Sequence, residues 1–465
     1  MKYIVIITVS VLKGVLCMKR RNVDMVGGPI IRGLLTMTIP IMIMNIMSSI
    51  FNIIDMTALR HFSTDMAVGA VGACGSLITM CTSLIVGLSP GANIVVARYI
   101  GAGDRESTDR AATTALAVSV LGGLLMLIVG VSGAELFLKL TNCPKELLSQ
   151  AVIYFKIYFL VYPFLMIYTF CAAILRSTGD TTRPMYFIIL GGIVKVVFSI
   201  TFLTIFDKDV ECVAFATGIS WAVMCVLSVI AVLKNEKLNI DLKKIRIYLK
   251  ELREILFVGI PSGIQTGLYS FANVIIMTVV NSFGPNATTG ISIANQFDGI
   301  LYQIAYSPSL AAIPFVAQNV GAKNFKRVKK VVLRAVLVTS GFGLVFGMLS
   351  AVFSKELSSI MSTTPEVIMY SRQKMMLISS TYFICGINEI VGVSLKGMGR
   401  PIIPTIATMV YMCAFRFLWV YVIYPLCPQN LTFLYLVWPI GWILSISTQL
   451  CFYFPTLKKL KQKYA

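Results

Sequence analysis

Runs of about 20 apolar residues recur about twelve times along this chain, and they constrain its fold more than any other feature. Each run is long enough to cross a hydrocarbon layer of roughly 30 Å as an α-helix. Of the 465 residues, 57% are apolar and only 13% are charged, a balance far from that of soluble globular proteins. The sequence therefore predicts an all-α polytopic membrane protein with twelve transmembrane helices.

Matching residues 220 or 221 positions apart indicate that the chain is duplicated. The pairs are Pro40 and Pro261, Asn52 and Asn273, Gly69 and Gly290, Gly101 and Gly321, Pro144 and Pro365, and Arg176 and Lys396. Because each half holds six spans, an even number, both halves enter the membrane from the same face. We expect two six-helix lobes that are parallel repeats, a plan used by secondary transporters.

Charged segments divide the chain into five parts. These are a leader and cytoplasmic segment at 1–33, an N-lobe at 34–233, a basic cytoplasmic linker at 234–254, a C-lobe at 255–455 and a basic tail at 456–465. Lys and Arg concentrate on alternate connections, which predicts that both termini are cytoplasmic in an inner or plasma membrane. Lys13 interrupts the apolar leader, so both Met1 and Met18 are possible starts.

Several functional classes are disfavoured by composition. The net charge of +20 is expected to record orientation in the membrane, not nucleic-acid binding. The 11 Cys are scattered without CxxC spacing, so we expect neither a metal site nor a disulfide framework. The chain has one His and no GxxxxGK[ST] segment, and we expect no catalytic residues, no cofactor and no ATP site. A membrane-embedded enzyme is the remote alternative.

Polar residues at helical spacing mark a candidate cavity. In the first span, Asn45, Ser48, Asn52 and Asp55 fall on one face. The fourth span carries three tyrosines at one-turn spacing, which either line a cavity or pack in the core. The expected cavity-lining residues are Asn45, Ser48, Asn52, Tyr154, Tyr158, Tyr162, Ser199, Gln265, Asn273, Asn295 and Tyr302.

Charged residues inside apolar spans are costly and mark candidate ion-coupling sites. The acids are Asp55, Asp298 and Glu389, and the bases that we expect as charge partners are Lys195 and Arg416. Asp55 is either a coupling acid or a helix-end residue, and Asp298 and Glu389 either take up a proton or pack by hydrogen bonds. For both C-lobe acids we expect no lysine at matching depth in spans seven, eight or ten. Arg416 is expected to be a structural anchor.

Five segments carry a family resemblance. They are FNIIDM at 51–56, ARYIGAG at 97–103, LRSTGDTTRPM at 175–185, AQNVGA at 317–322 and SLKGMGRP at 394–401. In order, duplication and spacing they resemble the multidrug and toxic compound extrusion (MATE) family, from about Gly27 to Lys459. The resemblance implies coupling through a first-helix Asp, which Asp55 matches, and an Asn and an Asp in the fifth helix. This chain has Lys195 and Ser199 there instead.

The resemblance also implies a function. It predicts a secondary active antiporter that exports organic cations or amphiphilic drugs in exchange for H⁺ or Na⁺ by alternating access. The expected partners are small organic molecules and membrane lipid, and we expect a monomer to be functional. A flippase for lipid-linked or polysaccharide precursors is the alternative, which a strongly cationic cavity would favour.

Lys195 generates a testable prediction, because its ammonium group can take the place of a bound cation beside Asp55. We expect Lys195→Asn to create a cation-binding geometry and to make transport depend more steeply on external Na⁺ or H⁺. Transport by proteoliposomes at varied ion concentrations measures this. If ion dependence and transport are both unchanged, Lys195 instead snorkels to the interface or forms a fixed ion pair.

Overall fold

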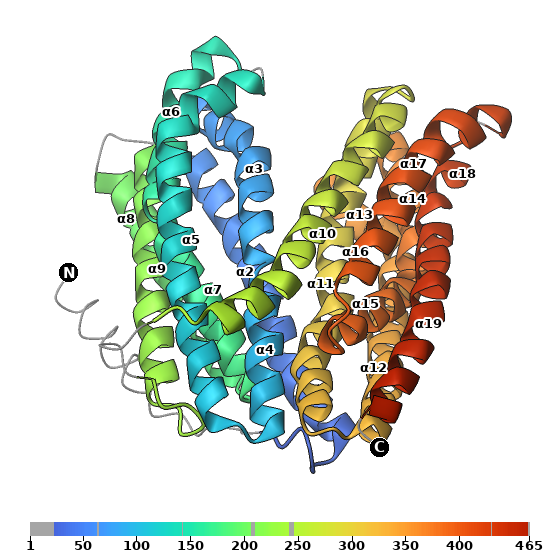
Figure 1. Cartoon of the computed structure of the whole chain (residues 1–465). Helices are drawn as coiled ribbons and strands as arrows, with labels where there is room; N and C mark the ends of the chain where they lie inside the picture. Colours follow the sequence, from blue (N-terminus) through green and yellow to red (C-terminus); the bar gives the residue numbers. More distant parts are fainter. Residues whose placement is uncertain are drawn as a thin grey trace. The chain divides into compact units, whose positions relative to one another are not determined.

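The computed structural model describes residues 23–62, 65–141, 143–205, 210–240, 246–428 and 430–463. All regular structure within these ranges is helical, as predicted (Figure 1). The helices of the first repeat are α2 (Ile30–Phe62), α3 (Asp65–Val86), α4 (Ser89–Ala102), α5 (Arg105–Leu140), α6 (Lys145–Leu160), α7 (Tyr162–Ser177), α8 (Thr182–Ile205) and α9 (Val210–Leu233).

The helices of the second repeat are interrupted more often. Its α-helices are α10 (Leu249–Asn281), α11 (Pro285–Gly321), α12 (Phe325–Val352), α13 (Ser354–Met361), α14 (Pro365–Ser380), α15 (Tyr382–Gly397), α16 (Ile402–Thr408), α17 (Phe415–Leu418), α18 (Leu431–Tyr435) and α19 (Val437–Lys463). Wider π-helical turns, η2 (Met409–Ala414) and η3 (Trp419–Ile423), flank α17, and a short 3₁₀ turn, η4 (Tyr424–Leu426), follows.

Helices lie over all twelve expected spans. Among the described residues, eight helical stretches are each long and apolar enough to cross a membrane, and two bent pairs bring the number to ten. α6 and α7 meet at 43°, and α14 and α15 meet at 45°. Pro163 opens α7 and has no N–H to continue the helix. At the second bend the Thr381 hydroxyl bonds back to the carbonyl oxygens of Leu377 and Ile378, which weakens the helical ladder.

Matching turns show the duplication in the backbone. Gly179 and Gly399 have φ angles of 95° and 81°, which favour glycine because it lacks a Cβ. Gly103 has a φ of 72°, and its counterpart Lys323 has a φ of 56°. The following residues, Asp104 and Asn324, each cap the next helix by accepting a backbone N–H three residues later. Related turns therefore occupy matching positions in the two repeats.

Contacts divide the chain into two compact units. One, which we call the N-lobe unit, contains Ile43–Gly259, and the other, the C-lobe unit, contains Asp24–Met42 and Ile260–Ala465. The start of each repeat's first helix thus groups with the other repeat. Both helices carry an internal proline, Pro40 in α2 and Pro261 in α10. Each proline lies within two residues of the point where its helix passes from one unit to the other. The expected lobe boundaries at 34–233 and 255–455 stay a prediction.

The segment that precedes α10 is fastened inside the N-lobe unit. Lys237 Nζ donates to the carbonyl oxygen of Thr178 at 2.8 Å, and the buried Asn235 amide donates to the Thr178 hydroxyl at 3.0 Å. Glu254 accepts from the Tyr99 hydroxyl at 3.1 Å and lies 3.7 Å from Arg98. Burial and the Glu254 carboxylate raise the pKa of Tyr99 above its usual range. The described part of the linker is therefore bound to α4 and to the turn after α7.

The segment that precedes α2 is fastened in a similar way inside the C-lobe unit. The buried Asn319 amide donates to the carbonyl oxygen of Met25 at 3.0 Å. Arg327 donates from Nε to the same oxygen at 3.3 Å, and from Nη2 to the carbonyl oxygen of Gly28. Each repeat's first helix is thus preceded by a bound segment.

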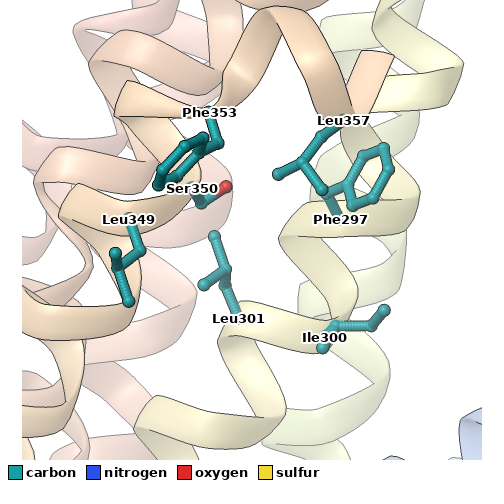
Figure 2. Close-up of a pocket in the computed structure, with 7 residues that line it drawn as sticks. All are labelled: Phe297, Ile300, Leu301, Leu349, Ser350, Phe353 and Leu357. Carbon is teal, nitrogen blue, oxygen red and sulfur yellow. The ribbon is translucent and has the colours of Figure 1, made fainter. Parts of the chain in front are cut away.

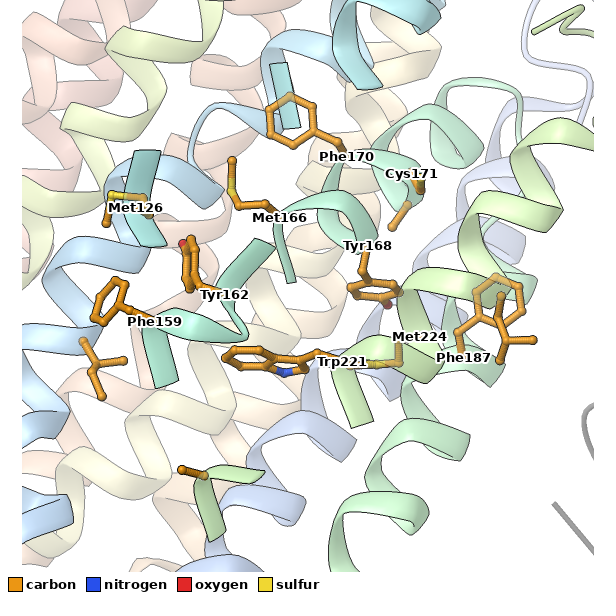
Figure 3. Close-up of a cluster of buried hydrophobic side chains, with 14 of the residues drawn as sticks. Met126, Phe159, Tyr162, Met166, Tyr168, Phe170, Cys171, Phe187, Trp221 and Met224 are labelled. Atoms are coloured by element: carbon orange, nitrogen blue, oxygen red, sulfur yellow. The ribbon is translucent and has the colours of Figure 1, made fainter. Parts of the chain in front are cut away.

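Aromatic side chains fill the core of the N-lobe unit (Figure 3). Tyr162 packs 5.5 Å from Phe159 and 6.4 Å from Trp221, and Tyr158 meets Trp221 edge-on at 4.9 Å. Tyr154 and Tyr162 are buried. The tyrosines expected as a cavity wall therefore contribute to the packing of the core. The bend at Val161 also interrupts their regular spacing, since Tyr162 lies on α7 and the other two lie on α6.

A close helix approach in the C-lobe unit can be tested at Gly347. A Cβ atom at Gly347 of α12 would lie 2.2 Å from the carbonyl oxygen of Ser379, on α14. Because a backbone atom cannot move away cheaply, we expect Gly347→Ala to lower the free energy of unfolding by about 1–3 kcal/mol. Thermal melts of the purified protein measure the effect.

The matched control is Gly341→Ala on the same helix, where nothing lies within 4 Å of the new Cβ. We expect an unchanged or slightly higher melting temperature there, because Ala favours helix more than Gly by about 1 kcal/mol. Equal melting temperatures for the two variants would contradict the close approach.

Candidate functional site

Two opposite faces of α11 differ in chemistry. Phe297, Ile300 and Leu301 face α12 and α13 across an apolar pocket of about 360 Å³ (Figure 2). The other lining residues are Leu349, Ser350, Phe353 and Leu357. Asn295, Asp298 and Tyr302 fall on the opposite side of the helix, since residues three, four and seven apart share a face. The polar face of α11 is the candidate functional surface.

A buried ion pair organises this polar face. Lys374 of α14 places Nζ 2.8 Å from Asp298 Oδ2, and the two side chains are only 4% and 11% exposed. The same ammonium donates to Asn295 Oδ1. The other carboxylate oxygen, Asp298 Oδ1, is buried and has no hydrogen-bond partner among the described residues. Asp298 is therefore half satisfied, with one oxygen left for a proton, an ion or a donor.

This ion pair corrects the expectation that no lysine lies near Asp298. Lys374 falls inside the tenth span, expected at about residues 368–395, but it follows Arg372 and Gln373 near the start of that span, where polar residues indicate a helix end. The fold reverses that inference, because α14 packs against α11 and carries Lys374 to the depth of Asp298. A lysine within an apolar span was the signal that sequence reasoning missed.

Two cations converge on Trp438 of α19. Lys374 Nζ lies 5.6 Å and Arg416 Cζ 5.1 Å from the centre of the indole ring, both within the range of cation–π attraction. Arg416 also donates from Nη1 to Asn273 Oδ1 at 2.9 Å. Asn273 and Asn295, both expected to line the cavity, are exposed, and Trp438 is partly exposed. We call Asn273, Asn295, Lys374, Arg416 and Trp438 the Trp438 cluster.

Arg416 lies in a stretch of irregular helix. Its short helix α17 is preceded and followed by π-helical turns, which are rare and often found at functional sites. The expected anchoring role remains a prediction. Its contacts with Asn273 and Trp438 place it within the polar cluster of the C-lobe unit.

Two further expected residues of this unit are buried. Glu389 of α15 lies seven residues, or about two turns, before the buried Lys396 on the same helix. Its neighbour Asn388 accepts from Gln449 Nε2 at 2.9 Å. Gln265 donates to the Thr408 hydroxyl at 2.9 Å, so it joins α10 to α16 inside the unit. Tyr302 stacks on Tyr306 at 5.4 Å along α11.

The candidate residues of the N-lobe unit are described less completely. Asn45 is half-buried, and Ser48 and Asn52 are exposed. Lys195 is half-buried, and Ser199 is buried with no hydrogen-bond partner for its hydroxyl among the described residues. The side chain of Asp55 lies outside the described part of the chain, so its pairing with Lys195 stays a prediction.

The Asp298–Lys374 pair makes a stability prediction. Asp298→Asn removes the carboxylate and leaves a buried ammonium uncompensated, which we expect to cost about 3–5 kcal/mol in free energy of unfolding. The double variant Asp298→Asn with Lys374→Met removes both charges and should regain most of that loss. Thermal melts of the wild type, the two single variants and the double variant measure this. Additive losses in the double variant would show that the two side chains do not interact.

Comparisons with known proteins agree with this architecture. The MatE family model matches residues 40–201 and 261–422, more than half of the chain and one match per repeat. The probable multidrug resistance protein YoeA of Bacillus subtilis is 26% identical over 380 residues, covering 80% of this chain and 82% of that protein. A protein named as an FAD transporter, from Shewanella oneidensis, is 25% identical over 400 residues, covering 83% and 86%.

Solved structures share the fold. A transporter of the MOP superfamily from Pyrococcus furiosus, described as having a binding pocket of reversed polarity, superimposes with a TM-score of 0.88 at 19% identity. A MATE crystal structure in the straight conformation also gives 0.88, at 18% identity. Each alignment covers 96% of this chain and 100% of that one. With both repeats matched, the chain belongs to the MatE family of multi-pass membrane transporters.

Proposed function

We propose that this protein exports amphiphilic organic compounds by alternating access and that Asp298 links export to the inward movement of H⁺ or Na⁺. The observation that carries the proposal is the half-satisfied carboxylate. Asp298 Oδ2 binds Lys374, whereas Oδ1 is buried without a hydrogen-bond partner among the described residues. A proton or Na⁺ at Oδ1 would complete its coordination and weaken its hold on Lys374.

The resemblance suggests organic cations or amphiphilic drugs as substrates, and relatives named for multidrug resistance support this reading. Alternating access requires that ion and substrate favour opposite-facing states. Asp298 lies beside the exposed Asn295, within reach of a bound compound on the polar face of α11. We also propose an inner or plasma membrane location with both termini cytoplasmic, on the charge asymmetry of the connections.

A second candidate function is favoured by the charges of the C-lobe unit. Among the described residues, its buried charged side chains are two acids, Asp298 and Glu389, and three bases, Lys374, Lys396 and Arg416. This basic surplus suits an anionic compound, such as a lipid-linked precursor. One relative is named as an FAD transporter.

The test imposes a pH gradient, a Na⁺ gradient and a membrane potential separately on proteoliposomes. Export of a fluorescent organic cation such as ethidium and of an anionic dye are both measured. We expect one ion gradient to drive transport in the wild type and to lose its effect when Asp298→Asn is combined with Lys374→Met, which retains charge balance.

The matched variant is Glu389→Gln, at the other buried acid of the C-lobe unit. Its ion-driven transport should persist if Asp298 carries the coupling. Loss of coupling in Glu389→Gln alone would assign the ion to Glu389. Export of the anionic dye by the membrane potential alone, with no response to either ion gradient, would overturn coupling and support the second candidate.

A further inference from the structure

The exposed amides of the Trp438 cluster are oriented by the cations beside them. Asn295 Oδ1 accepts from Lys374, and Asn273 Oδ1 accepts from Arg416 at 2.9 Å. An amide that faces a cation must present its oxygen, so in both residues Nδ2 points away from the positive charge. Because both side chains are exposed, each presents N–H donors to whatever occupies the adjacent space.

Lys374 has donor capacity left. An ammonium group carries three N–H donors, and Asp298 and Asn295 account for two of them. Because Lys374 is itself buried, its charge acts on a ligand through its electric field and through the exposed Asn295 amide that it orients. The polar surface around Trp438 therefore consists mainly of donors and positive charge, which suits ligands rich in acceptor atoms.

The charge balance of the C-lobe unit also favours an anion. Its buried charges, among the described residues, are two acids and three bases. A bound organic cation would enlarge the positive surplus where solvent screens poorly, and a bound anion would reduce it. Trp438 adds an apolar, partly exposed ring against which a planar group can pack.

The first repeat carries no ion pair or indole ring at the positions that match those of the second. At the 221-residue offset of the two family matches, Asp298 and Lys374 correspond to Leu77 and Ile153. Trp438 lies beyond the second match, and the same offset leads to Thr217. Leu77 belongs to the apolar core of the N-lobe unit. The Asp298–Lys374 pair and Trp438 are thus particular to the second repeat, whereas Asn273 and Arg416 have counterparts in Asn52 and Lys195.

We infer that the Trp438 cluster is a binding site for compounds that combine a carboxylate or phosphate group with a planar aromatic ring. The anionic group is held by the Nδ2 donors of Asn273 and Asn295, in the positive field of the buried Lys374 and Arg416, and the ring packs on Trp438. This inference rests on the proposed function, since it names the class of compound that the transporter exports.

The test compares two flavins that differ in one group. Flavin mononucleotide carries a phosphate that riboflavin lacks, and both fluoresce, so anisotropy reports their binding to the full-length protein in detergent. We expect flavin mononucleotide to bind about tenfold more tightly than riboflavin, the effect of charge-assisted hydrogen bonds to the phosphate. Ethidium, a planar cation, should bind more weakly than flavin mononucleotide.

The decisive variant is Asn273→Asp, which keeps the oxygen that accepts from Arg416 and replaces the NH₂ donor by a negative oxygen. We expect it to lower the affinity for flavin mononucleotide about tenfold and to leave riboflavin binding nearly unchanged. Asn281→Asp on the same helix is the control, because Asn281 is exposed and its amide oxygen accepts from the Thr288 hydroxyl, away from the cluster. Melting temperatures confirm that both variants fold.

Equal affinities for the two flavins in the wild type would overturn the inference. So would tighter binding of ethidium that Asn273→Asp strengthens, because this would identify a cation site. Binding is measured without any gradient, so it is independent of ion coupling. A preference for flavin mononucleotide without ion-driven transport would contradict only the proposed coupling, and ion-driven transport without that preference would contradict only the anion site.

Discussion

A charge buried in a membrane-spanning helix must find a partner, and the 2.8 Å pair between Lys374 and Asp298 meets that requirement in the C-lobe unit. The pair joins α14 to α11, and the same ammonium reaches Asn295 and the ring of Trp438 on α19. One lysine therefore fixes the relative positions of groups on three helices. The orientation of the exposed Asn295 amide depends on it, whereas Arg416 orients the Asn273 amide.

The two repeats share their backbone features but differ in the charged residues that they bury. The glycine-bearing turns between helices, the proline in the first helix and the bend in the fourth span occur in both repeats. Lys195 and Arg416 also correspond at the 221-residue offset. Asp298 and Lys374, in contrast, correspond to apolar residues. The backbone features are shared because they place six helices, whereas the interior of each unit is free to carry a different set of charges.

Breaks in the helices shape the molecule as much as the helices do. Pro163 and the back-bonded Thr381 bend the fourth span of each repeat, and π-helical turns surround Arg416. Interrupted helices expose backbone groups that must be satisfied nearby, which is why such breaks in membrane proteins occur against other protein segments or polar cavities. In the C-lobe unit the break at α17 places Arg416 against Asn273 and Trp438.

The sequence by itself determined the helical membrane fold, the duplication and the family, because apolar length and repeated turn signals are local properties of the chain. It also made Asp298, Asn295 and Asn273 candidates from their positions on helix faces, and Arg416 a candidate as a base within an apolar span. Only the tertiary structure decided that Lys374 pairs with Asp298, that Trp438 lies beside two cations, and that Tyr154 and Tyr162 pack in a core. Those facts depend on which helices meet and at what depth, and helix packing is set by contacts between segments far apart in the sequence, which periodicity within one segment does not encode.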